Sequence, residues 1–155
     1  MMSLVFTSLM LALTLVQAGP ARTPDFTGTW AIDRSRSQSP GSVTLGIKQT
    51  ATDVSVETTR GGTASVTVYT FEPSPQAAAE AITAGHSHAY WSETKLVTET
   101  SGNIQGQTVS YKQTRWLNAA GTEMTVETIV VVQHGYSIEG SKNYGTAKDV
   151  FVRTK

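Results

Sequence analysis

Two histidines separated by one residue are the sharpest candidate for chemistry in this chain. If His86 and His88 lie in an extended strand, both imidazoles point to one side and could share a metal ion. A third ligand would have to come from His134, Glu72 or Glu93, and the spacing selects none of them. The alternative is a pair of solvated histidines at the start of a strand that follows a glycine turn, and the pattern favours this alternative.

No catalytic nucleophile is indicated. The chain has no cysteine, which excludes thiol catalysis and disulfides, and no serine stands in a Gly-x-Ser-x-Gly setting. Glu57, Glu99 and Glu127 occur in similar contexts, but each alternates with apolar neighbours, so they are predicted to face solvent on repeating strands. The sequence therefore predicts a protein that is not an enzyme and that has no cofactor.

The alternating strands carry an inward face made of small side chains. This composition fills the inside of a closed sheet less completely than Leu and Phe would, so it permits either a ligand cavity or an interior filled by side chains. The predicted inward residues are Val43, Leu45, Ile47, Val54, Val56, Thr58, Met124, Val126, Thr128, Val130 and Val132. The candidate ligand-binding residues are Val56, Val68, Tyr69, Phe71, Tyr90, Trp91, Val126 and Thr128.

Strand patterns account for most of the chain beyond residue 23. Threonine is the commonest residue type, and short runs of two-residue alternation are separated by turn signals such as Gly61-Gly62. The only helix candidate begins at Ser74, which could cap it, with Pro75 in the first turn; an alanine-rich loop is the alternative. The predicted strands are residues 24–32, 43–50, 52–60, 63–71, 86–91, 94–100, 107–117, 122–133, 136–138 and 148–154.

Sequential strands with short turns predict an all-β fold. We expect a single up-and-down antiparallel barrel of about eight to ten strands, with one short helix or loop insertion, because closure leaves no free edges. Charged residues make up 15% of the chain and the formal net charge is zero. A neutral surface gives no reason to expect a nucleic-acid partner.

Residues 1–18 are predicted to be a secretory signal, and residues 19–155 the barrel domain. The apolar run from Leu4 to Val16 is too short to span a bilayer comfortably, and small residues precede a cleavage position after Ala18. An uncleaved anchor or a buried first strand is the alternative. Export would make the protein secreted or periplasmic, with no integral membrane segment after cleavage.

The stretch Pro24-Asp25-Phe26-Thr27-Gly28-Thr29-Trp30 resembles the opening strand of small secreted bacterial lipocalin-like domains. Its Gly-x-Trp core is similar to the first motif of lipocalin-type (calycin) barrels, and the terminal Val150-Phe151-Val152-Arg153 strand is a further match. The resemblance implies that a basic side chain near the last strand covers the first-strand Trp, with Arg153 as the candidate. The structural motif is therefore Phe26, Gly28, Trp30 and Arg153, which would close one end of the barrel.

Three functions are compatible with these patterns. The first is a secreted, non-catalytic barrel that holds a small apolar or amphipathic ligand. The second is a protein-binding barrel with a filled interior, for example a secreted inhibitor or envelope-associated module, whose protein partner the sequence does not identify. The third is an enzyme that uses His86 and His88, with or without a metal ion.

Overall fold

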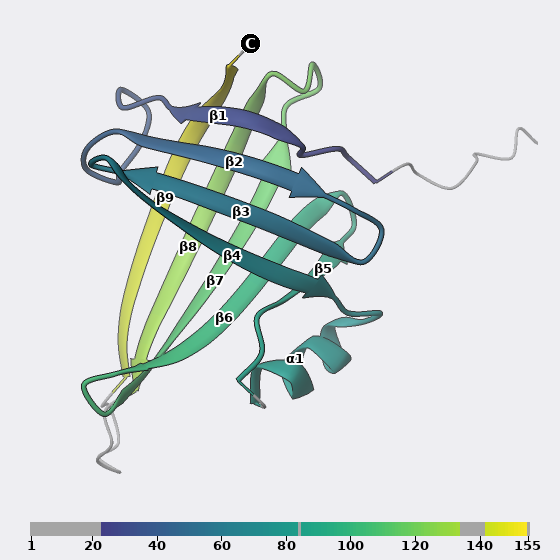
Figure 1. The fold of residues 1–155 in the computed structure, drawn as a ribbon, viewed down its shortest axis with the longest axis vertical. Helices are drawn as coiled ribbons and strands as arrows, with labels where there is room; N and C mark the ends of the chain where they lie inside the picture. The colour runs from purple at the N-terminus through teal and green to yellow at the C-terminus, as the bar shows by residue number, and fades with distance from the viewer. Residues whose placement is uncertain (1–22, 84, 134–141, 155) are drawn as a thin grey trace, which may run out of the picture.

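Nine strands close into one barrel in the computed structural model, which describes residues 23–83, 85–133 and 142–154 (Figure 1). The predicted all-β barrel with one short helix is confirmed. The elements are β1 (Gly28–Ile32), β2 (Val43–Gln49), β3 (Asp53–Arg60), β4 (Thr63–Phe71), α1 (Pro75–Thr83), β5 (His88–Ser92), β6 (Lys95–Ile104), β7 (Gln107–Leu117), β8 (Glu123–Gln133) and β9 (Lys142–Thr154).

The barrel closes where the first strand meets the last. β1 pairs antiparallel with both β2 and β9, and Trp30 lies opposite Arg153 in the β1–β9 ladder. The Arg153 guanidinium carbon lies 4.2 Å from the centroid of the Trp30 ring, so the basic side chain covers the indole in a cation–π contact. The Trp30 indole N–H donates to the carbonyl of Phe26 at 3.0 Å, so this buried pole has its polar atoms paired.

Gly28 leaves room for the Arg153 side chain to lie over Trp30. A Cβ atom on Gly28 would lie 2.6 Å from the Arg153 Nη1 atom, and the φ angle of Gly28 is +144°. Arg153 Nη1 donates to the carbonyl of Thr27, and its Nε donates to the carbonyl of Gly121 at 3.0 Å. The glycine of the Gly-x-Trp motif therefore makes room for a guanidinium that connects three segments of the chain.

One strand pair departs from the expected antiparallel order. β4 and β5 are parallel, and they pair only at Thr70 with His88 and at Phe71 with Ala89. The reason is the connection between them, which contains α1 and is long enough for the crossover that a parallel pair requires. The barrel is therefore mostly antiparallel, with one short parallel pair.

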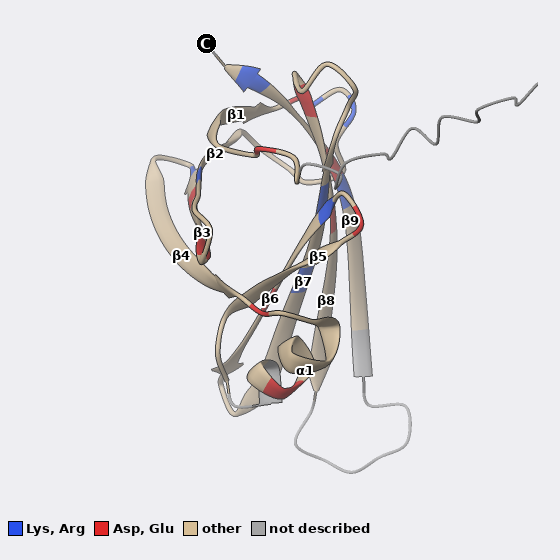
Figure 2. Ribbon diagram, turned by 90° about the vertical axis from the view of Figure 1, so that its right-hand side faces the viewer, with Lys and Arg blue, Asp and Glu red and all other residues tan. Residues whose placement is uncertain are grey.

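The predicted helix forms and docks on the outside of the barrel wall. The Ser74 hydroxyl accepts a hydrogen bond from the Ala77 N–H at 3.1 Å, which caps the first turn. Ala78 is buried against Tyr90 and Val97, so α1 lies beside β5 and β6 (Figure 2). A helix this short persists because it packs against the sheet.

Four predicted strand boundaries are wrong by two residues or more. β1 begins at Gly28 rather than at residue 24, and β6 ends at Ile104 rather than at residue 100. β9 begins at Lys142 rather than at residue 148, because its first half continues the ladder with β8 from Gln133 to Thr128. β5 begins at His88 rather than at His86. The predicted signal segment and the predicted strand at residues 136–138 lie outside the described residues.

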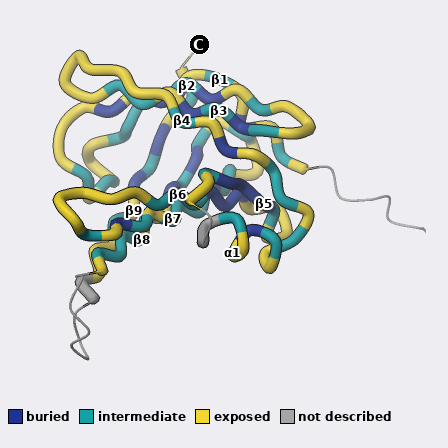
Figure 3. Tube along the Cα trace, turned by 60° about the horizontal axis from the view of Figure 1, so that its bottom comes forward, coloured by how far each residue is buried: buried dark blue, intermediate teal, exposed yellow. Residues whose placement is uncertain are grey.

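The core lies inside the upper part of the barrel, between β1–β3 and the C-terminal strands (Figure 3). Val43, Leu45, Ile47, Val54, Val56, Met124 and Val126 are buried as expected from their alternation. Thr58, Thr128, Val130 and Val132 are half-buried. Part of the inward face therefore borders space rather than packed side chains.

Candidate functional site

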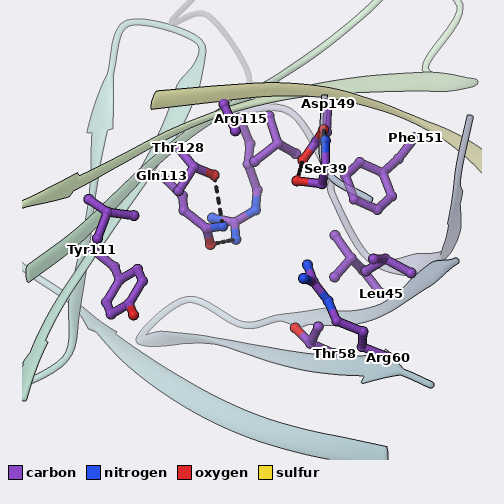
Figure 4. Close-up of a pocket in the computed structure, with 14 residues that line it drawn as sticks. Ser39, Leu45, Thr58, Arg60, Tyr111, Gln113, Arg115, Thr128, Asp149 and Phe151 are labelled. Carbon is purple, nitrogen blue, oxygen red and sulfur yellow. Dashed lines mark hydrogen bonds between the residues drawn. The ribbon is translucent and has the colours of Figure 1, made fainter. Parts of the chain in front are cut away.

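A cavity of about 290 Å³ lies inside the barrel. β2 and β3 form one wall, and β7, β8 and β9 form the opposite wall (Figure 4). Its apolar lining is Val43, Leu45, Val126, Val130, Ala147 and Phe151, and its polar lining is Ser39, Thr58, Arg60, Tyr111, Gln113, Arg115, Thr128 and Asp149. Apolar walls with a few convergent polar groups are typical of small-molecule sites, and this volume is at the small end of their range.

Arg115 is the most unusual residue of this cavity. It lies on the inward face of β7 and is 1% exposed. Its Nη1 donates to the Thr98 hydroxyl at 2.7 Å, and its Nη2 donates to the Gln113 side-chain carbonyl. The Gln113 amide in turn donates to the Thr128 hydroxyl at 3.2 Å (Figure 4). Together with the bond to Thr98, these contacts form a polar chain that crosses the wall from β6 to β8.

All of these acceptors are neutral. Within the described residues, no carboxylate forms an ion pair with Arg115, and its Nε atom has no hydrogen-bond partner. Burial lowers the pKa of the Arg115 guanidinium to about 10, so the group is still charged at neutral pH. A buried charge without a counterion is costly, and an anion that entered the cavity would relieve that cost.

The one carboxylate in the cavity lining, that of Asp149, already accepts hydrogen bonds from the protein. Asp149 accepts hydrogen bonds from the backbone N–H groups of Gln38 and Ser39, at 3.0 and 2.8 Å, and from the Ser39 hydroxyl at 2.5 Å. These bonds hold the loop between β1 and β2 against β9. The cavity therefore contains one carboxylate that is already hydrogen-bonded, that of Asp149, and one buried guanidinium, that of Arg115, without a counterion among the described residues.

Arg60 and Tyr111 line the more exposed part of the cavity. Arg60 ends β3 and Tyr111 lies on β7, and both side chains project into the same space from opposite walls (Figure 4). Tyr111 is 39% exposed although it is a large aromatic residue. Arg60 forms no ion pair within the described part of the chain. The cavity thus combines a second positive charge near solvent with a buried one.

The structure distributes the predicted ligand-binding residues over several environments. Val126 and Thr128 line the cavity. Val56 and Tyr69 are buried in the core, and Phe71 stacks on Trp91 with the ring centroids 5.7 Å apart at the edge of that core. Val68 points outward and is 55% exposed, and Tyr90 packs beneath α1 on the outer wall.

The two candidate metal ligands lie in different surroundings. His86 is exposed in the segment before β5, whereas His88 is fully buried beside α1. The His88 Nε2 atom lies 3.4 Å from a carboxylate oxygen of Glu99 without a hydrogen-bond partner. Among the described residues no group of three His, Cys, Asp or Glu side chains could hold a metal ion. Metal binding by this pair stays a prediction.

The prediction that all three glutamates face solvent freely is wrong for Glu99. Glu57 and Glu127 are exposed, but Glu99 forms an ion pair with Lys112 at 2.9 Å and accepts a hydrogen bond from the Tyr90 hydroxyl at 3.1 Å. Burial acts to raise the pKa of Glu99, but the hydrogen bond and charge of Lys112, together with the hydrogen bond from Tyr90, lower it, and the net pKa is lowered. Glu99 lies opposite His88 in the β5–β6 ladder and bonds to Tyr90, which packs against Ala78 of α1.

The predicted site residues do not include Arg115, Gln113, Arg60 or Tyr111. The available signal was the two-residue alternation of the predicted strand at residues 107–117, which places Tyr111, Gln113 and Arg115 on one face. Polar side chains on an inward face are informative because they require partners inside the barrel. The predicted inward face included Thr58 and Thr128 but none of the polar residues of the strand at 107–117.

Solved structures of other proteins align with most of this chain. No protein-family model matches the chain, and no curated protein sequence matches it. Apo lipid binding protein 8 from Caenorhabditis elegans aligns with 12% identity and a TM-score of 0.49, over 83% of this chain and 95% of that one. The REP1-NXSQ fatty acid transporter aligns with 9% identity and a TM-score of 0.41, over 83% of this chain and 96% of that one. In the described part of the chain, no helix has the length and hydropathy needed to cross a bilayer.

Proposed function

We propose that this protein binds one small amphipathic molecule inside the barrel and that the acidic group of this ligand pairs with Arg115. The observation that carries the proposal is a buried guanidinium that faces a cavity and has no carboxylate partner among the described residues. Apolar side chains such as Leu45 and Phe151 would contact the remainder of the ligand.

The chemistry of the cavity favours a carboxylate or a similar planar oxyanion. A guanidinium presents its donors in a fixed fork, and Arg115 uses Nη1 and Nη2 for neutral side-chain oxygens while its Nε is unpaired. An anion could replace the Gln113 acceptor or bind beside it. The pairing would strengthen in this low-dielectric interior relative to water.

The cavity volume supports a ligand-binding barrel over a protein-binding barrel with a filled interior. Side chains leave about 290 Å³ unfilled between the two walls. A ligand of this size contains a short or medium apolar part rather than a long one, unless the ligand extends out past Tyr111. No catalytic step is proposed.

Calorimetric titration tests the proposal with a pair of ligands of equal length. We expect a medium-chain fatty acid to bind with a stoichiometry near one, and the matching primary alcohol to bind at least about tenfold more weakly, because a hydrogen bond to a charged group contributes about 1.5–3 kcal/mol. Arg115→Met should remove this preference. Arg34→Met, on an exposed turn, is the matched control and should retain it. Equal affinity of the acid and the alcohol for the wild-type protein would contradict the proposal.

We also propose that the protein is exported by its N-terminal segment, as its apolar run and small residues indicate. The test is the N-terminal sequence of the mature protein recovered from the extracellular or periplasmic fraction. Cleavage after Ala18 supports export. A protein that keeps its first residues inside the cell contradicts it.

A further inference from the structure

Strand β4 has a free edge along most of its length. It pairs with β3 from Thr63 to Thr70, but its ladder with β5 contains only Thr70 and Phe71. Within the described residues, the stretch Thr63–Tyr69 therefore has a backbone partner on one side only. Figure 1 shows this edge at the border of the layer formed by β1–β4, turned away from β3.

The register identifies the backbone groups that point to the free edge. Thr70 donates its N–H to Ser87 on the β5 side, whereas Phe71 donates to Thr52 on the β3 side. Because the direction alternates along an antiparallel strand, Ala64, Val66 and Val68 turn both their N–H and their C=O to the free edge. Each of these residues therefore offers one donor and one acceptor to an incoming strand.

The side chains of this edge lack the features that usually prevent strand pairing. The range Thr63–Phe71 contains no charged residue and no proline, and β4 is drawn without blue or red in Figure 2. Val66 and Val68 are 58% and 55% exposed. Edge strands normally carry lysine, proline or a bulge that blocks association, and β4 has a β-branched, uncharged surface instead.

We infer that a second copy of this chain covers the edge, with β4 antiparallel to β4 about a twofold axis at Val66. In this register Val66 lies opposite Val66 of the second copy, and Ala64 lies opposite Val68 of the second copy. All the free backbone groups of the three residues are then paired in both copies. Val66 and Val68 of both copies form one apolar stripe on the outer face.

The two ends of the edge differ in how much space they leave. A groove of about 560 Å³ lies where the free edge ends, and it is lined by Val68, Thr70, Glu72, Ala81, Gly85, His86 and Ser87. At the other end β4 begins at the Gly61-Gly62 turn, which has no side chains. The antiparallel register brings the turn of each copy beside the groove of the other copy.

Sedimentation equilibrium over a range of protein concentrations tests this inference without any ligand. We expect the wild-type protein to have twice the mass of one chain. Val66→Pro should raise the dissociation constant of the dimer by about tenfold or more, because it removes a donor in each copy. The monomer should tolerate this proline, since the Val66 N–H faces solvent in a single copy.

Two lysine variants provide the matched comparison. Val66→Lys places a charge on the axis of the dimer and should make the protein monomeric. Ile129→Lys replaces an exposed apolar residue on the outer face of β8, which is paired on both sides, and should leave the dimer intact. Wild-type protein that remains monomeric at every concentration, or a dimer that persists in both Val66 variants, would overturn the inference.

Hydrogen exchange gives a second readout within the same strand. The Val66 and Val68 amides should become protected as the protein concentration rises. The Thr67 amide faces β3 and should be protected at every concentration. If exchange of the Val66 amide does not depend on concentration, the inference is wrong whatever the ligand titration shows.

Discussion

At the residue scale, two arginines on inward-facing positions have opposite surroundings. Arg153 stacks on Trp30 and donates to the carbonyls of Thr27 and Gly121, so its charge lies at a sealed pole. Arg115 donates only to neutral side chains beside an unfilled cavity. The first arrangement stabilises the barrel, and the second leaves an unsatisfied cation that a ligand could neutralise.

Adding one methyl group to Gly28, at the sealed pole, should destabilise the fold. Gly28→Ala should lower the free energy of unfolding by about 1–3 kcal/mol, because the new Cβ would displace the Arg153 guanidinium and would meet a positive φ angle. Denaturant unfolding measures the effect. Gly102→Ala is the control, since a Cβ there meets nothing within 4 Å, and it should change stability little. Equal stability of the two variants would contradict this account of Gly28.

The surface carboxylate of Asp33 should account for part of the loss of folding stability at low pH. The hydrogen bond from Ser35 and the hydrogen bond and charge of Arg36 lower the pKa of Asp33 from 3.8 to about 2. A lowered pKa stabilises the folded state above the unfolded value, and this contribution disappears as the pH falls from about 3.8 to about 2. Asp33→Asn should therefore show a smaller loss of stability over this range than the wild-type protein, measured by thermal unfolding. A parallel loss in both proteins would contradict this assignment.

At the element scale, α1 determines much of what the strand pattern alone could not predict. Alternation predicted most strands, and the residue types Ser74 and Pro75 predicted the helix start, because these features depend on local sequence. It did not predict the parallel β4–β5 pair or the burial of His88 and Glu99, because both depend on where the crossover places the helix. The path of the connection between β4 and β5 depends on tertiary contacts, which the local sequence does not encode.

The helix cap can be tested separately from helix docking. Ser74→Ala should destabilise α1 by about 1 kcal/mol, since the first turn loses the acceptor for the Ala77 N–H. Hydrogen exchange of the α1 amides should accelerate while the β7–β8 ladder stays protected. Ser65→Ala is the control, because Ser65 is exposed on β4. Unchanged exchange in α1 would show that docking of Ala78 alone holds the helix.

At the scale of the whole molecule, the barrel has one sealed end and one hollow region. The motif strand and the last strand close the Trp30 pole, and both were predicted from short motifs. The cavity was only one of two predicted outcomes, because whether small inward residues leave space depends on how the two walls cross. Its charge was not predicted, since the inward face of the predicted strand at 107–117, which carries Arg115, was not among the predicted site residues.

Carbon-13 NMR of a bound medium-chain fatty acid, labelled at its carboxyl carbon, shows whether the ligand pairs with Arg115. We expect the bound carboxyl to stay ionised at pH values where the free acid is protonated, because the Arg115 charge stabilises the carboxylate. In Arg115→Met the bound signal should titrate near the free acid or be lost. A bound wild-type signal that titrates like the free acid would contradict the pairing with Arg115.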